Sequence, residues 1–357
     1  MKIVTVIGAR PQFIKAAVVS RAFRENYPEA KEVIVHTGQH FDANMSTLFF
    51  DELDIPHPDY NLNIGGGTHG QNTGRMIEKV EEVLTRESPD YLLVYGDTDS
   101  TLAGAMAAVK LHIPVVHVEA GLRSFNRQMP EEINRVLTDH MASLLFAPTA
   151  TSIQNLALEG ISGDKVINVG DVMYDASLYY GSVSGARLNI FTDLNIASKQ
   201  YILATLHRQE NTDNQERLVN IFAGLEKSSY PIILPLHPRT KKMLSFFDLS
   251  LPSNIHVIEP VGYLEMIALE KYASLIVTDS GGVQKEAFFH KVPCLTLRDE
   301  TEWVELIEVK ANQLVNADST LIADFLNAEL PSFPQDVPNL YGSGNSGNLI
   351  AEYLINR

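Results

Sequence analysis

The sequence predicts an α/β protein with two doubly wound, Rossmann-like domains that face a cleft. Short apolar runs rich in Val and Ile alternate with longer amphipathic segments along the chain, a rhythm typical of parallel sheets covered by helices. The chain has 357 residues, and at roughly 100–200 residues per domain this length indicates two domains. A single sheet would need about ten strands, near the limit for an open twisted sheet, which also favours two domains.

In the first half, the apolar runs are nearly continuous, as in strands that are buried on both faces. They predict strands over Lys2–Ile7, Glu32–His36, Tyr91–Tyr95, Pro114–Val118 and Leu144–Ala147. The segments between them predict helices over Pro11–Arg24, Gln71–Thr85, Thr98–Leu111 and Pro130–Ala142.

The second half repeats this alternation. It predicts strands over Tyr201–Leu206, Pro231–Leu236, Ile255–Ile258, Ser274–Thr278 and Pro293–Leu297. It also predicts helices over Asn214–Lys227, Tyr263–Lys271 and Gly281–His290. We expect a first domain over residues 1–169, where the first sheet ends, and a second over 170–340. Residues 341–357 should form a C-terminal helix that packs back on the first domain.

Composition excludes several classes of function. There are 28 Lys and Arg against 44 Asp and Glu, a net charge of −16, which disfavours nucleic-acid binding. No apolar run approaches the roughly 18–20 residues that span a bilayer, and the apolar start, Met1–Ile7, is too short for a signal peptide. The only cysteine, Cys294, rules out a disulfide framework within the chain and fits a reducing cytoplasm. An anionic ligand would therefore need a local positive cluster.

The turn after the first expected strand carries such charges. Gly8 permits a tight turn, and Pro11 suits the first turn of a helix. Arg10 and Lys15 then flank a helix start that itself favours anions. The alternative is that both are ordinary surface charges on a turn. The segment is neither a dinucleotide fingerprint nor a Gly-Lys-Ser/Thr phosphate loop.

Three carboxylates from separate elements are expected at one edge of the first sheet. Asp97 and Glu119 follow neighbouring strands, and Glu131 lies at a helix start. Each residue type also has a structural use, since Asp caps helices and Glu suits the helix dipole. Carboxylates that converge raise one another's pKa, as proton transfer from a weakly acidic carbon requires.

The second half offers groups for binding a diphosphate. His207 ends a strand and is a candidate for anion contact or acid–base work. Ser280, Gly281 and Gly282 follow a buried strand at a helix start, where backbone N–H groups can approach a diphosphate closely. Glu286 in that helix could accept from ribose hydroxyls, and Arg298 adds a cation. The alternative is that Ser280, Gly281 and Gly282 form only a tight turn and bind no ligand. The scattered histidines lack metal-ligand spacing, and no Ser-nucleophile elbow occurs.

These motifs together resemble the non-hydrolysing UDP-N-acetylglucosamine 2-epimerases over essentially the whole chain. The resemblance rests on Gly-Ala-Arg-Pro-Gln-Phe-Ile-Lys at 8–15, Gly-Asp-Thr at 96–98 and His-Val-Glu-Ala-Gly-Leu-Arg at 117–123. Pro-Glu-Glu-Ile-Asn-Arg at 130–135 and Thr-Asp-Ser-Gly-Gly at 278–282, followed by Glu286, complete it. It implies a glycosyltransferase-B-like fold, a UDP-sugar in the cleft and usually a homodimer.

The resemblance also implies a reaction and its residues. Members invert C2 of the sugar by eliminating UDP to a 2-acetamidoglucal and adding it back, and they serve cell-surface polysaccharide biosynthesis. No redox cofactor, metal, nucleic acid or membrane insertion is implied. The family's catalytic residues fall on Asp97, Glu119, Glu131 and His207. Its substrate contacts fall on Arg10, Lys15, Ser280, Gly281, Gly282, Glu286 and Arg298.

Departures from the common family pattern leave the sugar open. Ala9, Gln12 and Phe13 stand where Thr, Glu and Ala are usual, and His-Pro-Arg-Thr occupies 237–240. A related branch acts on UDP-2,3-diacetamido-glucuronic acid, whose extra carboxylate an Arg-bearing cleft could accept. Three readings compete with the epimerase: a glycosyltransferase of the same architecture, a hydrolysing epimerase and a non-catalytic nucleotide-sugar binding module. The last has no need for three carboxylates in its site.

Overall fold

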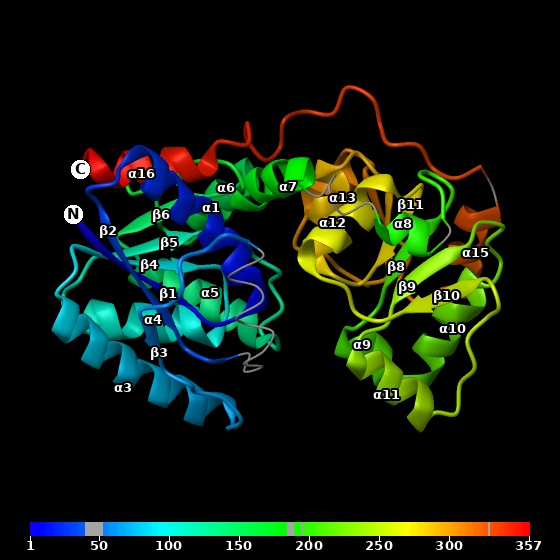
Figure 1. Cartoon of the computed structure of the whole chain (residues 1–357), viewed down its shortest axis with the longest axis horizontal. Helices are drawn as coiled ribbons and strands as arrows, with labels where there is room; N and C mark the ends of the chain where they lie inside the picture. The colour runs from blue at the N-terminus through cyan, green and yellow to red at the C-terminus, as the bar shows by residue number, and fades with distance from the viewer. Residues whose placement is uncertain (40–52, 184–188, 195, 328) are drawn as a thin grey trace. The chain divides into compact units, whose positions relative to one another are not determined.

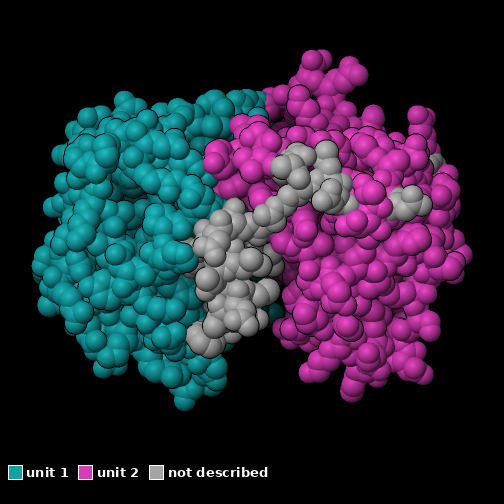
Figure 2. All heavy atoms as spheres, in the orientation of Figure 1, with its two compact units in different colours: residues 1–176, 339–357 teal, residues 177–338 magenta. Residues whose placement is uncertain are grey.

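The computed structural model describes the whole chain except residues 40–52, 184–188, 195 and 328 (Figure 1). It divides into two compact units, residues 1–176 with 339–357 (unit 1) and residues 177–338 (unit 2), coloured separately in Figure 2. None of the described helices combines the length and apolar character needed to cross a bilayer. That residues 1–169, 170–340 and 341–357 form separate domains stays a prediction.

Unit 1 is built on a parallel sheet in the order β3-β2-β1-β4-β5-β6-β7. Its strands are β1 (Lys2–Ile7), β2 (Lys31–His36), β3 (Tyr60–Asn61), β4 (Tyr91–Tyr95), β5 (Val115–Val118), β6 (Leu144–Ala147) and β7 (Val166–Asn168). Its helices are α1 (Arg10–Asn26), α3 (His69–Glu87), α4 (Asp99–Lys110), α5 (Pro130–Met141), α6 (Ala150–Leu158) and α16 (Ser346–Ile355).

Helices cover both faces of this sheet (Figure 1). On one face, alternate strand residues such as Val4 and Val94 pack against Val80 of α3 and Ala105 of α4. On the other, α1 packs against α16, where Gly347 lies so close to Val18 that an added Cβ would approach its Cγ1 to 2.6 Å. Apolar burial on both faces is what the near-continuous apolar strands predict.

Unit 2 contains a second parallel sheet, in the order β10-β9-β8-β11-β12-β13. Its strands are β8 (Ile202–Thr205), β9 (Ile232–Pro235), β10 (Ile255–Ile258), β11 (Leu275–Thr278), β12 (Cys294–Thr296) and β13 (Asn312–Leu314). Its helices are α8 (Asn189–Asp193), α9 (Gln209–Thr212), α10 (Gln215–Leu225), α11 (Pro238–Phe246), α12 (Tyr263–Tyr272), α13 (Gly281–Phe289), α14 (Val304–Glu308) and α15 (Ser319–Asn327). Helix α7 (Val172–Val183) begins in unit 1 and ends in unit 2.

Both units are doubly wound, as the sequence predicts. In each sheet every described strand pair is parallel, and the first strand lies in the interior. In chain order, the strands of unit 1 are added first on one side of β1 and then, from β4 onward, on its other side; β8 and β11 have the same relation in unit 2. We call the place between these two strands the reversal point of the sheet. Ligands of open α/β sheets bind there, at the carboxyl ends of the strands.

Candidate active site

The reversal point of unit 1 lies between β1 and β4, and the loop after β1 is fixed there by Gln12. Its side-chain oxygen accepts hydrogen bonds from the N–H groups of Gly8 (2.8 Å) and Ala9 (3.0 Å). Its amide nitrogen donates to the carbonyl of Tyr95 and to Thr101, each at 2.9 Å. The buried side chain thus uses both of its ends to join the loops that follow β1 and β4.

Close packing also constrains this loop. A Cβ on Gly8 would lie 2.0 Å from the hydroxyl of Thr37 and 2.2 Å from that of Ser100, so only glycine fits. Helix α1 begins at Arg10, whose backbone the structure describes and whose side chain lies outside the described part. Lys15 lies in the next turn and is buried.

The buried ammonium group of Lys15 pairs with the carboxylate of Glu119. Glu119 follows β5 and has a φ of 71°, in the left-handed region that side chains other than Gly, Asn and Asp rarely adopt. Two hydrogen bonds hold this conformation, from the N–H groups of Glu119 and Ala120 to the carbonyl of Phe146, both 3.1 Å long. The structure therefore brings two of the predicted residues into direct contact.

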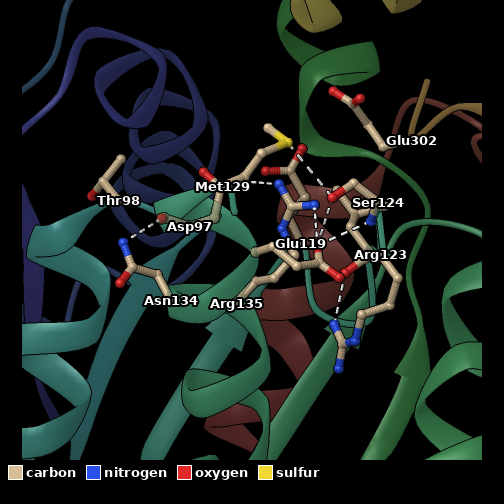
Figure 3. Close-up of polar contacts among 12 residues, drawn as sticks. Asp97, Thr98, Glu119, Arg123, Ser124, Met129, Asn134, Arg135 and Glu302 are labelled. Carbon is tan, nitrogen blue, oxygen red and sulfur yellow. Dashed lines mark hydrogen bonds and ion pairs between the residues drawn. The ribbon is translucent and has the colours of Figure 1, made fainter. Parts of the chain in front are cut away.

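Asp97 lies at the end of the neighbouring strand β4, and its carboxylate is bound by the guanidinium of Arg135. The amide of Asn134 donates to the backbone carbonyl of Asp97 over 3.0 Å, and Figure 3 shows both α5 side chains turned toward this residue. Asp97 is not the cap of α4, because Thr98 takes that role by accepting from the N–H of Thr101. The Asp97 side chain is 30% exposed, which leaves it accessible to a ligand.

The two glutamates at the start of α5 have different environments. Glu132 is buried and accepts hydrogen bonds from the N–H groups of Ser124 (2.9 Å) and Phe125 (3.0 Å) and from Arg135 (2.9 Å). Glu131 is exposed, and no hydrogen bond or ion pair joins it to another described residue. It precedes Arg135 by four residues, so the two occupy one face of α5. Glu132 therefore stabilises the loop before α5, whereas Glu131 is accessible to a ligand.

In unit 2 the reversal point lies between β8 and β11, where Asp279 organises the loop after β8. Its fully buried carboxylate accepts from the N–H groups of His207 (3.0 and 3.1 Å) and Arg208 (2.9 Å). The Nδ1 atom of His207 lies 3.3 Å from Oδ1 of Asp279, so the carboxylate also orients the imidazole. Burial lowers the pKa of His207, with Asp279 opposing and Arg208 adding to the effect. A neutral ring with Nδ1–H toward Asp279 presents a basic Nε2.

The start of α13 is shaped for a ligand that approaches the backbone. Ser280 caps the helix by accepting from the N–H of Val283. A Cβ on Gly281 would lie 2.3 Å from Oε1 of Glu302, whereas around Gly282 the nearest described atoms lie 3.8 Å away or more. Gly281 therefore has no room for a side chain, because Glu302 lies against it. Gly282 has open space beside the helix N-terminus.

Arg298 is joined to the start of α13 through Glu302. Its Nη1 donates to Oε2 of Glu302 over 2.7 Å, and its side chain is almost fully buried. Glu286, one turn further into α13, is also buried, with an oxygen 4.0 Å from where a Cβ of Gly282 would lie. The predicted residues Ser280, Gly281, Gly282, Glu286 and Arg298 therefore form one cluster within unit 2.

Three contributing residues escaped the sequence analysis. Arg135 and Asp139 follow Glu131 at intervals of four along α5, so the three occupy one face of the helix. That spacing was the available signal. Asp279 had its own signal, since it stands in the Thr-Asp-Ser-Gly-Gly motif directly before the helix cap.

Two all-parallel doubly wound units, each with polar groups at its reversal point, define a nucleotide-binding α/β protein of the glycosyltransferase-B-like class. The sequence model of the family described as UDP-N-acetylglucosamine 2-epimerase matches residues 22–355. The chain belongs to this family of isomerases, which confirms the resemblance found in the sequence.

Individual relatives agree over their whole length. The chain is 53% identical to UDP-2,3-diacetamido-2,3-dideoxy-D-glucuronate 2-epimerase of Pseudomonas aeruginosa strain PAO1, with 99% of each chain covered. It is 48% identical to UDP-N-acetylglucosamine 2-epimerase of Methanocaldococcus jannaschii, again with 99% of each covered. The crystal structure of the M. jannaschii enzyme in complex with UDP-GlcNAc and UDP matches with a TM-score of 0.90 at 46% identity, covering 100% of both chains.

Proposed function

We propose that the protein catalyses reversible epimerisation at C2 of UDP-N-acetylglucosamine, giving UDP-N-acetylmannosamine. The observation that carries the proposal is the pair of carboxylates at neighbouring strand ends. Asp97 and Glu119 are each bound by a buried cation, Arg135 and Lys15, within a family of 2-epimerases. A module that only bound nucleotide sugars would have no use for this pair.

The chemistry requires a leaving group, because no carbonyl flanks the C2 proton. The C1–O bond to UDP breaks and takes its electron pair with UDP. A carboxylate removes the C2 proton, and a C1=C2 double bond forms, which gives a 2-acetamidoglucal. Return of UDP to C1 and of a proton to the opposite face of C2 completes the inversion, so the reaction needs no oxidant.

Unit 1 supplies the groups for proton transfer in this proposal. Asp97, Glu119 and Glu131 take and return the C2 proton and stabilise positive charge that develops at C1. Lys15 and Arg135 bind and orient two of these carboxylates. Arg10 begins a helix whose N-terminus favours the diphosphate.

Unit 2 supplies the groups that bind and release UDP. The N–H groups at the start of α13 and the Arg298 guanidinium stabilise negative charge as UDP departs. Glu286 accepts from ribose hydroxyls. His207, oriented by Asp279, donates a proton or a hydrogen bond to the leaving group.

A second substrate has specific support. Identity to the P. aeruginosa diacetamido-glucuronate epimerase is 53%, against 48% to the M. jannaschii UDP-N-acetylglucosamine enzyme. UDP-2,3-diacetamido-glucuronate is therefore the alternative substrate, and the C2 chemistry would be the same. We further propose a cytoplasmic homodimer, supported by the one reduced cysteine and the family resemblance. Light scattering after size-exclusion chromatography measures the oligomeric state.

Isotope exchange tests the reaction directly. The purified protein is incubated with UDP-N-acetylglucosamine in deuterated water and followed by proton NMR. We expect a mixture of two UDP-sugars with deuterium at C2. Release of free sugar would indicate hydrolysis instead, and absence of exchange would exclude this substrate. Repetition with UDP-2,3-diacetamido-glucuronate decides between the two substrates by their kcat/KM.

A further inference from the structure

Beneath the two carboxylates of unit 1 lies a fully buried histidine that the proposed chemistry does not use. His117 is in β5, two residues before Glu119, and its side chain has no solvent exposure. Its Nε2 lies 2.7 Å from the backbone carbonyl oxygen of Gly96, and its Nδ1 lies 2.7 Å from Oδ1 of Asp139. Both ring nitrogens therefore face acceptors.

This geometry defines the hydrogen bonds of the ring. A carbonyl oxygen can only accept, so Nε2 of His117 donates to Gly96. The Nδ1 atom shares a hydrogen bond with Oδ1 of Asp139. The second oxygen of Asp139 accepts from Arg123 (2.7 Å) and from the N–H of Gly121 (3.1 Å). Both ring nitrogens and both carboxylate oxygens of this buried pair are therefore used.

The surrounding groups favour the ionised carboxylate of Asp139. Burial alone would raise the pKa of Asp139, but His117 and Arg123 outweigh burial, so the pKa lies below its usual value. Arg123 is shared with Glu159, to which it donates two hydrogen bonds of 2.7 Å. His140 lies 3.3 Å from that outer glutamate. The inner ion pair is thus His117 with Asp139, and Arg123 links it to the half-exposed Glu159.

The network reaches both carboxylate-bearing loops through the backbone. The Gly96 carbonyl that His117 binds immediately precedes Asp97, and the Gly121 N–H that Asp139 binds lies two residues after Glu119. Glu119 has an unfavourable positive φ, which costs about 1–3 kcal/mol and persists only where the surroundings hold it. One buried pair therefore restrains both loops.

We propose that His117 is a positioning residue that, through its hydrogen bonds to Gly96 and to Asp139, fixes the loops of Asp97 and Glu119. It does not contact substrate. This inference rests on the proposed function.

Kinetics of the variants test the positioning role. His117→Gln should lower kcat at least tenfold while the Kd for UDP changes less than about threefold. A residue that positions the carboxylates should change kcat more than the Kd for UDP, because UDP binding is assigned to unit 2. Glu159→Gln, which removes only the outer partner of Arg123, is the matched control and should stay within about twofold of the unaltered enzyme.

The outcomes separate the two proposals. An unaltered protein without C2 exchange would end the proposed function. An active enzyme in which His117→Gln keeps its kcat, or in which the Kd for UDP rises as much as kcat falls, would overturn the positioning role and leave the proposed function in place.

Discussion

The ammonium of Lys15 and the carboxylate of Glu119 form an ion pair between residues 104 positions apart, with side chains only 11% and 7% exposed. The pair joins α1 to the end of β5, across the reversal point of the unit 1 sheet. Both partners are buried, so each compensates the charge of the other. This contact connects the stability of unit 1 to its proposed chemistry.

Replacing Lys15 by Met should therefore lower both the stability of the protein and its turnover. Breaking a buried ion pair by removing one partner costs about 3 kcal/mol. We expect a lower free energy of unfolding in urea and a kcat reduced by at least tenfold. Combining Lys15→Met with Glu119→Gln should recover part of the stability. A double variant whose loss equals the sum of the two single losses would show that the pair is not coupled.

Asp97→Asn should abolish most turnover and spare UDP binding. The amide is nearly isosteric and can still meet Arg135, but it cannot accept the C2 proton. Losses from removing a general base are typically about 10²–10⁴-fold. We expect kcat to fall in this range while the Kd for UDP, from calorimetry, changes little, because UDP binding is assigned to unit 2.

The matched control for this variant is Asp90→Asn. Asp90 stands at the opposite end of the same strand, where it accepts from the N–H of Lys2 over 2.7 Å, and it is exposed. This variant should turn over normally. Normal turnover by Asp97→Asn would remove Asp97 from the proposed mechanism.

The sequence analysis predicted the fold better than it predicted the supports of the site. β4 and β6 occur over the residues predicted, because each is one short apolar run. β3 has two residues and β13 three, too few to produce a recognisable run. These strands depend on pairing with a neighbour, which only the folded sheet supplies.

The same distinction applies to the site. Strand-end reasoning identified Asp97 and Glu119, because parallel strands deliver their carboxyl ends to one edge. The cations that hold them were not predictable as partners. Arg135 lies 38 residues from Asp97, and nothing in their spacing indicates contact. Such pairings arise from the packing of α5 beside β4 and β5.

Asp279→Asn should shift the pH dependence of turnover. Asp279 raises the pKa of His207, opposing the effect of burial, so its loss lowers that pKa further. If His207 donates a proton to departing UDP, its ring must be protonated, so the basic limb of the kcat/KM profile moves to lower pH. A basic limb that stays in place would show that Asp279 does not affect the titration of His207.

Glu270→Gln should stabilise the protein at neutral pH. Glu270 is fully buried, and burial, with Glu286 adding to it, raises its pKa well above 4.5. A raised folded-state pKa means that the native state binds an extra proton, so stability falls as pH rises from about 4.5 to the folded pKa. Within this window the variant should gain on the unaltered protein by about 1.4 kcal/mol per pH unit.

Fluorescence provides the measurement for this prediction. The chain has one tryptophan, Trp303, which is buried in unit 2 with Glu270, so its emission reports unfolding of that unit. Urea unfolding is followed from pH 5 to pH 8. The exposed Glu308→Gln serves as control and should show the same pH dependence as the unaltered protein. A stability difference that does not change with pH would mean that Glu270 is ionised in the native state.

Neighbouring glycines at the start of α13 should respond to alanine with opposite signs. The methyl group of Gly281→Ala would lie 2.3 Å from Oε1 of Glu302, the residue that holds Arg298. We expect lower stability and at least tenfold weaker UDP binding. Gly282→Ala has room, with its nearest neighbours at 3.8 and 4.0 Å, so the loss of backbone freedom in the unfolded chain should stabilise the protein by about 0.4–1 kcal/mol. Urea unfolding at Trp303 and calorimetric titration with UDP measure both effects. Equal stability changes for the two variants would show that Glu302 moves aside. Unchanged UDP affinity of Gly281→Ala would show that Arg298 does not bind the diphosphate.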